Sequence, residues 1–281
     1  MDDNNQAMQD RLEAIQINDV WNCIERLSNS VQRIRVLAAL IDTHADLREL
    51  MDGLTIPRTT LQRNLSLLEE HNWIKRDSSG YTTTTRGRLL VDAFIEMLEK
   101  FQRIDALSPF LAEVDHSRAI DISQLNDIRV TVPEPNQPHA PMSRLFDSFN
   151  RAKHIRGCLP FVSWLLIEYS PTVDEISAVS HEYVVSRTAL ETLDTQYTTG
   201  CADIGETNGV DINVYVFEDD LPYGLFISED GLILAAYNEI GRIQALVESE
   251  HETAIEWGRQ TYETYRQQSQ QLRESDIPTP T

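Results

Sequence analysis

One short segment carries side chains that can form hydrogen bonds to the edges of nucleic-acid bases. Arginine can bind guanine through two hydrogen bonds, glutamine can bind adenine in the same way, and threonine can contact a thymine methyl group or a phosphate. The segment after Pro57 presents all three residue types on one helical face: Arg58, Thr59, Gln62 and Arg63. The opposite face carries a buried stripe at helical spacing: Leu61, Leu65 and Leu68. These residues are therefore our candidates for base reading.

The alternative for this segment is a solvated polar face of an ordinary helix. Base reading is favoured because the first acidic residues, Glu69 and Glu70, come only at the C-terminal end of the helix. The N-terminal end is the part that normally enters the major groove. Asn64 could reach either the helix backbone or a base, and it ranks below the other four.

A second group of side chains is suited to phosphate, which fixes position and affinity without reading sequence. It consists of Thr60, Lys75, Arg76, Arg86 and Arg88. The alternative for the basic members is that they balance nearby acidic residues.

The sequence lacks the patterns of common catalytic and metal sites. There is no CxxC or HExxH pair, no Gly-rich phosphate loop and no Gly-x-Ser-x-Gly motif. The His-x-Lys-x4-Asp motif of phospholipase-D-like enzymes is also missing, because Arg156 stands where the lysine would follow His154. Three dispersed cysteines support neither a disulfide framework nor a zinc site. We therefore expect no enzyme activity, catalytic residue, metal or cofactor.

The elements that must position the first candidates follow one another between residues 15 and 107. Apolar spacing predicts helices near 15–27, 31–41 and 45–51, and a fourth that begins at about Pro57 and ends near residues 71–72. A hairpin over 73–84 turns at Asp77-Ser78-Ser79-Gly80, and a helix then runs to about residue 107. Helices, hairpin and helix in this order are typical of a winged helix-turn-helix domain.

Residues 108–274 predict a second domain in which strands and helices mix. Strands are expected near 128–132, 155–159, 212–218, 224–228, 232–237 and 243–247, with a final helix over 251–272. The fold class is therefore α+β, with an N-terminal winged helix-turn-helix and a C-terminal mixed α/β domain resembling a sensor. Residues 1–14 and 275–281 are expected to be flexible ends.

The second domain holds one distinctive polar cluster, formed by Glu218, Asp220 and Tyr223. These residues could stand at the rim of a pocket for a small effector. The alternative is a solvated acidic hairpin, and the many acidic loops in this half of the chain favour that alternative.

The 281-residue chain has a formal net charge of -21, which at first argues against nucleic acid as a partner. However, residues 1–100 hold 16 acidic and 12 basic residues, a net of -4, so the remainder carries -17. Only three of the 24 basic residues are lysine. Acid excess with few lysines is typical of proteins in molar salt, where the Debye length is about 3 Å. An acidic mesophilic protein is the alternative.

Three stretches resemble the archaeal winged-helix regulators that carry the domain named for a methanogenesis regulator, a group abundant in haloarchaea. They are LRELMDGLTIPRTTLQRNLSLLEEHNWIKR at 47–76, GYTTTTRGRLL at 80–90 and VYVFEDDLPYGLFISEDGLILAAYNEIGRIQALVES at 214–249. The second contains a Thr-x-x-Gly helix start, Thr84 to Gly87, and differs from the family at Thr83, where leucine is commoner. The resemblance implies DNA binding and an effector-binding C-terminal domain.

Together these observations predict a cytoplasmic transcriptional regulator of a halophilic archaeon that binds double-stranded DNA as a homodimer. Its C-terminal domain is expected to sense a small molecule, and no membrane association is expected. The alternative function is a winged helix that binds another protein without sequence-specific DNA binding.

Overall fold

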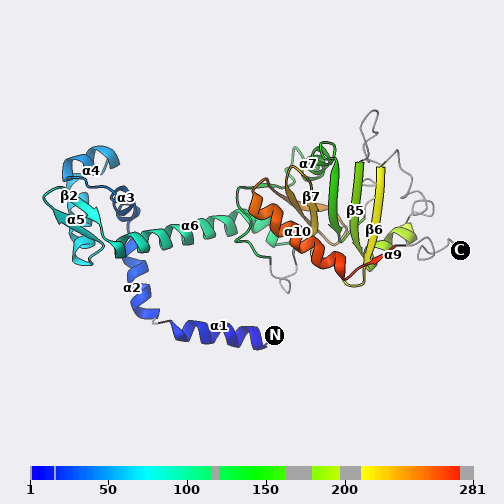
Figure 1. The fold of residues 1–281 in the computed structure, drawn as a ribbon, viewed down its shortest axis with the longest axis horizontal. Helices are drawn as coiled ribbons and strands as arrows, with labels where there is room; N and C mark the ends of the chain where they lie inside the picture. The colour runs from blue at the N-terminus through cyan, green and yellow to red at the C-terminus, as the bar shows by residue number, and fades with distance from the viewer. Residues whose placement is uncertain (1, 16, 115–119, 163–178, 197–209, 273–281) are drawn as a thin grey trace. The chain divides into compact units, whose positions relative to one another are not determined.

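The computed structural model describes residues 2–15, 17–114, 120–162, 179–196 and 210–272 (Figure 1). The chain divides into two compact units, Met1–Lys100 and Phe101–Thr281. The helix α6, Thr85–Leu111, crosses the boundary between them. The predicted tail at 275–281 lies outside the described residues, as do residues 163–178 and 197–209.

The N-terminal unit has the predicted order of elements. It contains the helices α1 (Asp2–Ala14), α2 (Ile17–Ser28), α3 (Val31–Ala39), α4 (Leu47–Leu54) and α5 (Arg58–Glu70). The strands β1 (Ile74–Asp77) and β2 (Gly80–Thr83) form an antiparallel hairpin before α6. Helix α1 occupies a segment for which the sequence predicted a flexible lead-in.

One apolar core holds these helices and the hairpin together. Leu61 and Leu68 are fully buried on α5, together with Val36 and Leu37 of α3. Helix α4 begins at a capping box in which Asp46 accepts hydrogen bonds from the backbone N–H groups of Arg48 and Glu49. The core leaves the outer face of α5 uncovered.

The C-terminal unit is built on an eight-stranded mixed sheet. Its strands are β3 (Ile128–Thr131), β4 (His154–Leu159), β5 (Val179–Ser186), β6 (Val210–Phe217), β7 (Gly224–Ile227), β8 (Leu232–Tyr237), β9 (Ile243–Ser249) and β10 (Gln270–Gln271). The order across the sheet is β10-β6-β5-β4-β7-β8-β9-β3. Among the described strands, only the pairs β4–β5 and β5–β6 are parallel. The α+β class predicted from the sequence is confirmed.

Helices cover both faces of this sheet (Figure 1). On one face α10 (Glu252–Gln267) buries Ala254 and Tyr262 against the sheet. On the other face α7 (Ala140–Phe149) buries Leu145 and Phe149, and α9 (Arg187–Gln196) buries Leu190 in the same apolar cluster. The predicted final helix ends earlier than expected, because residues 270–271 pair with β6 as β10.

The sheet contains one buried histidine that gives the C-terminal unit a specific acid sensitivity. His181 on β5 is 3% exposed, and its Nδ1 atom lies 3.2 Å from the Tyr183 hydroxyl. Burial, together with a smaller effect of the charge of His154, lowers the pKa of His181 to about 4. Its pKa in the unfolded chain is about 6.5, so protons bind the unfolded state preferentially below that pH.

We therefore expect the stabilising contribution of neutral His181 to be complete above about pH 6.5 and to be lost as the pH falls to 4. The loss amounts to about 3 kcal/mol. Denaturant titrations at several pH values should show a shallower fall in stability for His181→Gln than for the native chain over this range. The acidic residues titrate in both proteins, so their contribution cancels in the comparison. Equal profiles of stability against pH would contradict the assignment of the acid sensitivity to His181.

Candidate functional site

The outer face of α5 presents all four residues predicted to read bases. Arg58, Thr59, Gln62 and Arg63 are exposed, while Leu61 and Leu65 on the same helix are buried. Among the described residues, none of the four makes a hydrogen bond or an ion pair with another side chain. Within each of the pairs Arg58/Gln62 and Thr59/Arg63 the residues are four positions apart. The four side chains therefore form one exposed polar face on the first two turns of α5.

Asn64 differs from these four because it faces the core. It is 4% exposed, and its Oδ1 accepts a hydrogen bond from Nε of Arg33 at 3.4 Å. Arg33 also donates to the backbone carbonyl of Arg26. Asn64 thus links α5 to α3, which explains why a polar residue interrupts the buried face of α5.

The hairpin β1–β2 is attached to the segment between α3 and α4. Ala45 and Tyr81 exchange backbone hydrogen bonds of 3.0 and 2.9 Å. Gly80 lies in the left-handed region with φ 121°, and a Cβ atom there would stand 2.6 Å from the Ala45 oxygen. Only glycine fits this close approach. The turn is therefore held at a defined place relative to the helices.

The charged residues of the hairpin differ in their partners within the fold. Lys75 and Arg76 are exposed, and the Arg76 guanidinium lies over the Tyr81 ring at 5.2 Å. Asp77 accepts a hydrogen bond from the Ser79 backbone and lies 3.3 Å from His44. These contacts lower the pKa of the Asp77 carboxyl, the Ser79 hydrogen bond contributing most. The Asp77 carboxylate at the turn thus has its partners, Ser79 and His44, within the fold.

The two arginines at the start of α6 have different surroundings. Arg88 donates to both carboxylate oxygens of Asp42, at 2.7 and 2.9 Å, and lies 3.9 Å from Asp92. Its charge is balanced by acidic residues, as the alternative from the sequence proposed. Arg86 is exposed and acts on the Cys23 thiol, whose pKa burial raises and Arg86 lowers. Thr60 is exposed on α5.

In the C-terminal unit, the residues predicted to bind an effector make contacts within the fold. Glu218 accepts hydrogen bonds from Arg187 at 2.6 and 3.3 Å, which lower its pKa, and Asp220 accepts one from Thr188 at 2.9 Å. Tyr223 is 5% exposed in the core, where burial raises its pKa. The two acidic residues therefore bind the first turn of α9, and their role toward a ligand stays a prediction.

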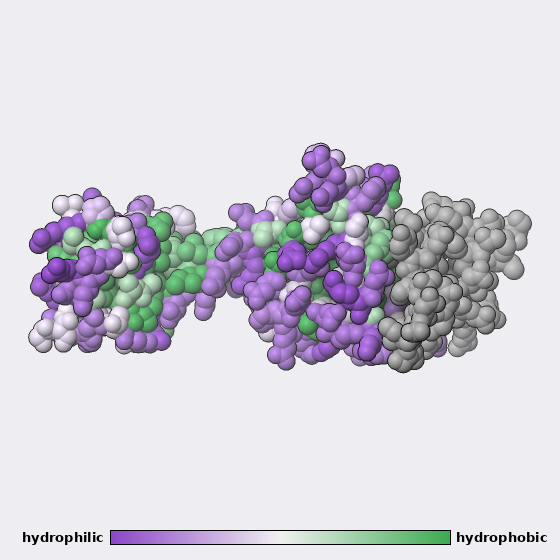
Figure 2. Space-filling model, turned by 90° about the horizontal axis from the view of Figure 1, so that it is seen from above, coloured by the Kyte–Doolittle hydropathy of each residue, from purple (hydrophilic) through white to green (hydrophobic). Residues whose placement is uncertain are grey.

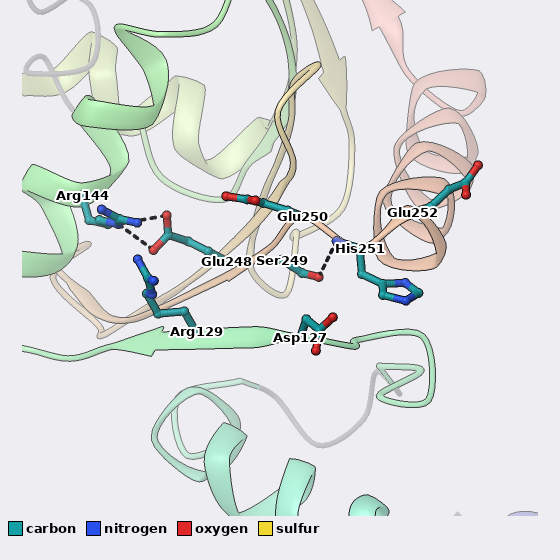
Figure 3. Close-up of a pocket in the computed structure, with 8 residues that line it drawn as sticks. All are labelled: Asp127, Arg129, Arg144, Glu248, Ser249, Glu250, His251 and Glu252. Atoms are coloured by element: carbon teal, nitrogen blue, oxygen red, sulfur yellow. Dashed lines mark hydrogen bonds and ion pairs between the residues drawn. The ribbon is translucent and has the colours of Figure 1, made fainter.

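A cleft of about 460 Å³ lies elsewhere in this unit, at the edge of the sheet (Figure 3). It is lined by Asp127, Arg129, Arg144, Glu248, Ser249, Glu250, His251 and Glu252. Nε of Arg144 donates to both oxygens of Glu248, at 3.0 and 2.8 Å, which raises the pKa of Arg144. Arg129 extends from β3 toward this pair and has no ion-pair partner among the described residues. The sequence missed this cleft because β3 and β9 are far apart in the chain.

Two further findings concern the described part of the chain. No helix within it is long and apolar enough to cross a membrane. Within the same residues, no group of three or more His, Cys, Asp or Glu side chains is arranged to hold a metal ion.

Family models match both units of the chain. Residues 21–106 match the HVO_A0261 N-terminal domain, and residues 138–268 match the middle domain of the methanogenesis regulatory protein FilR1. No curated protein matches the chain.

Solved structures resemble the chain only distantly. TrmBL2, described as an archaeal chromatin protein with a novel mode of DNA binding, is 12% identical with a TM-score of 0.38 over 89% of this chain and 99% of its own. NucT from Helicobacter pylori is 8% identical, with a TM-score of 0.39 over 52% of this chain and 99% of its own. The phospholipase D family member Nuc from Salmonella typhimurium is 14% identical, with a TM-score of 0.39 over 53% and 100%.

The family matches fall on the two units in the order that the sequence resemblance predicted. The chain is therefore similar, unit by unit, to the HVO_A0261 N-terminal domain and to the middle domain of the methanogenesis regulatory protein FilR1.

Proposed function

We propose that this protein is a DNA-binding transcriptional regulator of the archaeal cytoplasm that binds a duplex operator as a homodimer. The observation that carries the proposal is the outer face of α5, where Arg58, Thr59, Gln62 and Arg63 are exposed and make no hydrogen bond or ion pair with other described side chains. These side chains have the donors and acceptors that base edges require.

The acidic surface is compatible with this function if the host cytoplasm is near molar salt. Counterion release then adds little affinity for each phosphate contact. Affinity must come from the fit of α5 to base edges and from the use of two half-sites. An ion pair such as Arg88–Asp42 neutralises one positive charge near the DNA. Its effect on DNA affinity is small in such a protein, because that affinity does not depend on bulk positive charge.

The experiment that tests the function is mapping of genome-wide occupancy at native salt, combined with the transcriptome of a deletion strain. We expect discrete sites with a two-fold repeat near genes whose expression changes. Footprinting of the purified full chain in molar KCl on one such site should protect both half-sites. Absence of any footprint would favour the second function, a winged helix that binds another protein.

We further propose that the C-terminal unit binds a small effector. The cleft of Figure 3 supports this role, because its lining combines the carboxylates of Asp127 and Glu250 with Arg129, which has no ion-pair partner among the described residues. Such a lining suits a small molecule with an anionic group next to a hydrogen-bond donor, such as an amino acid. The cluster of Glu218, Asp220 and Tyr223 is the second candidate.

The cleft can be tested by thermal shift with the twenty free amino acids. We expect at least one to raise the Tm of the native chain and to lose that effect in Arg129→Ala. Glu218→Ala is the matched control, since Glu218 lies in the other candidate cluster. A ligand effect abolished by Glu218→Ala and kept by Arg129→Ala would move the effector site to that cluster.

A further inference from the structure

The cleft at the edge of the sheet is lined by an unequal set of charges (Figure 3). Two guanidinium groups, those of Arg129 and Arg144, face four carboxylates, those of Asp127, Glu248, Glu250 and Glu252. Arg144 is paired with Glu248. Among the described residues, Arg129 and the other three carboxylates have no ion-pair partner. The cleft therefore holds unbalanced charges of both signs, with the negative charges in excess.

Exposed acidic residues alone would not mark a site on this protein. The chain has 45 of them, and hydrophilic surface prevails on the face of the C-terminal unit that Figure 2 shows. The cleft differs because buried contacts fix its acidic segments. Ser249 is 3% exposed, and its hydroxyl donates to the backbone carbonyl of Asn126 and accepts from the His251 N–H at 3.2 Å. One buried side chain thus joins the segments that carry Asp127 and Glu250.

Further contacts attach the same segments to the start of α10. The side-chain amide of Asn126 donates to the Thr253 hydroxyl at 3.0 Å. His251 is the N-cap of α10 and accepts a hydrogen bond from the Thr253 backbone N–H. The same helix end stabilises the Glu252 carboxylate, which explains one acidic residue within the fold. The backbone that carries the other carboxylates is ordered before a ligand binds, and this lowers the entropic cost of binding.

The charges of the lining indicate which kind of ligand would balance them. Among the described residues, no group of three or more His, Cys, Asp or Glu side chains is arranged to hold a metal ion. A simple anion would pair with Arg129 and leave Asp127 and Glu250 unbalanced. A diamine would pair with the two carboxylates and leave Arg129 unbalanced. A molecule with two positive charges and one carboxylate provides a partner for all three residues.

We propose that this cleft binds a cationic amino acid of the lysine or arginine type. The proposal rests on the effector role of the proposed function and adds the chemical class of the ligand. The ligand carboxylate pairs with Arg129, and its two positive groups pair with Asp127 and Glu250. The Arg144–Glu248 pair already balances its own charges and requires none from the ligand.

Matched ligands test the class by isothermal titration calorimetry on the full chain. Norleucine is lysine without the side-chain ammonium, cadaverine is lysine without the carboxylate, and citrulline is the uncharged counterpart of arginine. In KCl of about 0.5 M the Debye length is about 4 Å, so charges in contact still attract. We expect lysine, arginine or both to bind, each about tenfold more tightly than its counterparts, because a missing charge leaves one side chain of the cleft unpaired.

Variants of the cleft test the location. Asp127→Asn and Glu250→Gln should each raise the Kd for the cationic amino acid about fivefold, and the double variant should bind lysine and norleucine within about twofold of each other. Asparagine tolerates the left-handed backbone of Asp127, whose φ is 46°, so this variant should fold. Asp230→Asn is the matched control, because Asp230 is exposed in the β7–β8 turn outside the cleft. It removes the same charge and should leave the Kd unchanged.

Three results would overturn the cationic class. They are equal affinities for each cationic amino acid and its uncharged counterpart, cadaverine that binds as tightly as lysine, and equal effects of Asp127→Asn and Asp230→Asn. The last result would show that only the net charge of the chain matters.

The outcomes also separate the ligand class from the proposed function. Binding of a neutral or acidic amino acid that is lost in Arg129→Ala would overturn the cationic class and leave the effector site in place. Binding of no amino acid at all would overturn both the class and the use of this cleft for amino acids. The footprinting experiment tests DNA binding independently of either result.

Discussion

Replacing Gly87 with alanine is expected to lower the free energy of unfolding of the N-terminal unit by about 3 kcal/mol or more. A Cβ atom at this position would stand 1.9 Å from the carbonyl oxygen of Trp73 and 2.7 Å from its carbonyl carbon. The contact is with backbone, which no side-chain rotation can relieve. That carbonyl also accepts hydrogen bonds from the Thr84 backbone N–H at 2.9 Å and from its hydroxyl at 3.1 Å.

Gly87 and Thr84 thus form one joint between the hairpin and α6. The Thr84 hydroxyl also accepts a hydrogen bond from the Gly87 N–H at 3.1 Å and so caps the first turn of α6. This is the physical basis of the Thr-x-x-Gly helix start. Separation of α6 from the hairpin would expose Trp73, which is 2% exposed in the folded unit.

Gly53 is the matched control for this prediction. It lies in α4, and a Cβ atom there would meet nothing within 4 Å. Gly53→Ala should therefore be neutral or stabilise the unit by up to about 1 kcal/mol, as alanine favours helix. Denaturant titration followed by tryptophan fluorescence compares the two variants. Equal free energies of unfolding for Gly87→Ala and Gly53→Ala would contradict the prediction. They would show that the contact between α6 and the hairpin can open without loss of stability.

The second large effect concerns Arg63, which we expect to read a base. Arg63→Ala should weaken binding to the operator by about 1–3 kcal/mol, roughly 5- to 150-fold, and relax the preference at one base position. Affinity for random duplex DNA should change little. Arg63 is exposed and makes no hydrogen bond or ion pair with described side chains, so the substitution should leave the Tm of the chain unchanged. Fluorescence anisotropy on operator and random duplexes measures both affinities.

Arg88→Ala provides the comparison, because Arg88 is expected to contact phosphate rather than a base. It should weaken operator and random DNA by similar factors, and its ion pair with Asp42 should keep these losses small. If Arg63→Ala also reduced both affinities equally, Arg63 would be a phosphate contact and the base-reading assignment would fail.

The order of elements in the N-terminal unit could be predicted because each is encoded locally. The stripe of Leu61, Leu65 and Leu68 and the turn at Asp77–Gly80 are signals within a few residues of one another. The uses of single polar residues could not be predicted in this way. Asn64 is buried against Arg33, and Arg88 is paired with Asp42, because the fold brings distant segments together.

The same distinction holds for the C-terminal unit. Strands near 224–228, 232–237 and 243–247 were predictable from their apolar runs and turns. The lateral order of the sheet was not, because pairing of β3 with β9 joins segments more than a hundred residues apart. The cleft depends on that pairing, because Arg129 of β3 and Glu248 of β9 both line it. The sequence pointed instead to Glu218 and Asp220, which lie close together in the chain.

By itself, the sequence determined the α+β class, the winged-helix order and the polar face of α5, since periodicity and turn chemistry act over short distances. Only the tertiary structure decided which of the polar side chains remain available. Burial covers Asn64, ion pairing occupies Arg88 and Glu218, and Arg63 is left exposed, because each outcome depends on which distant groups the fold brings near.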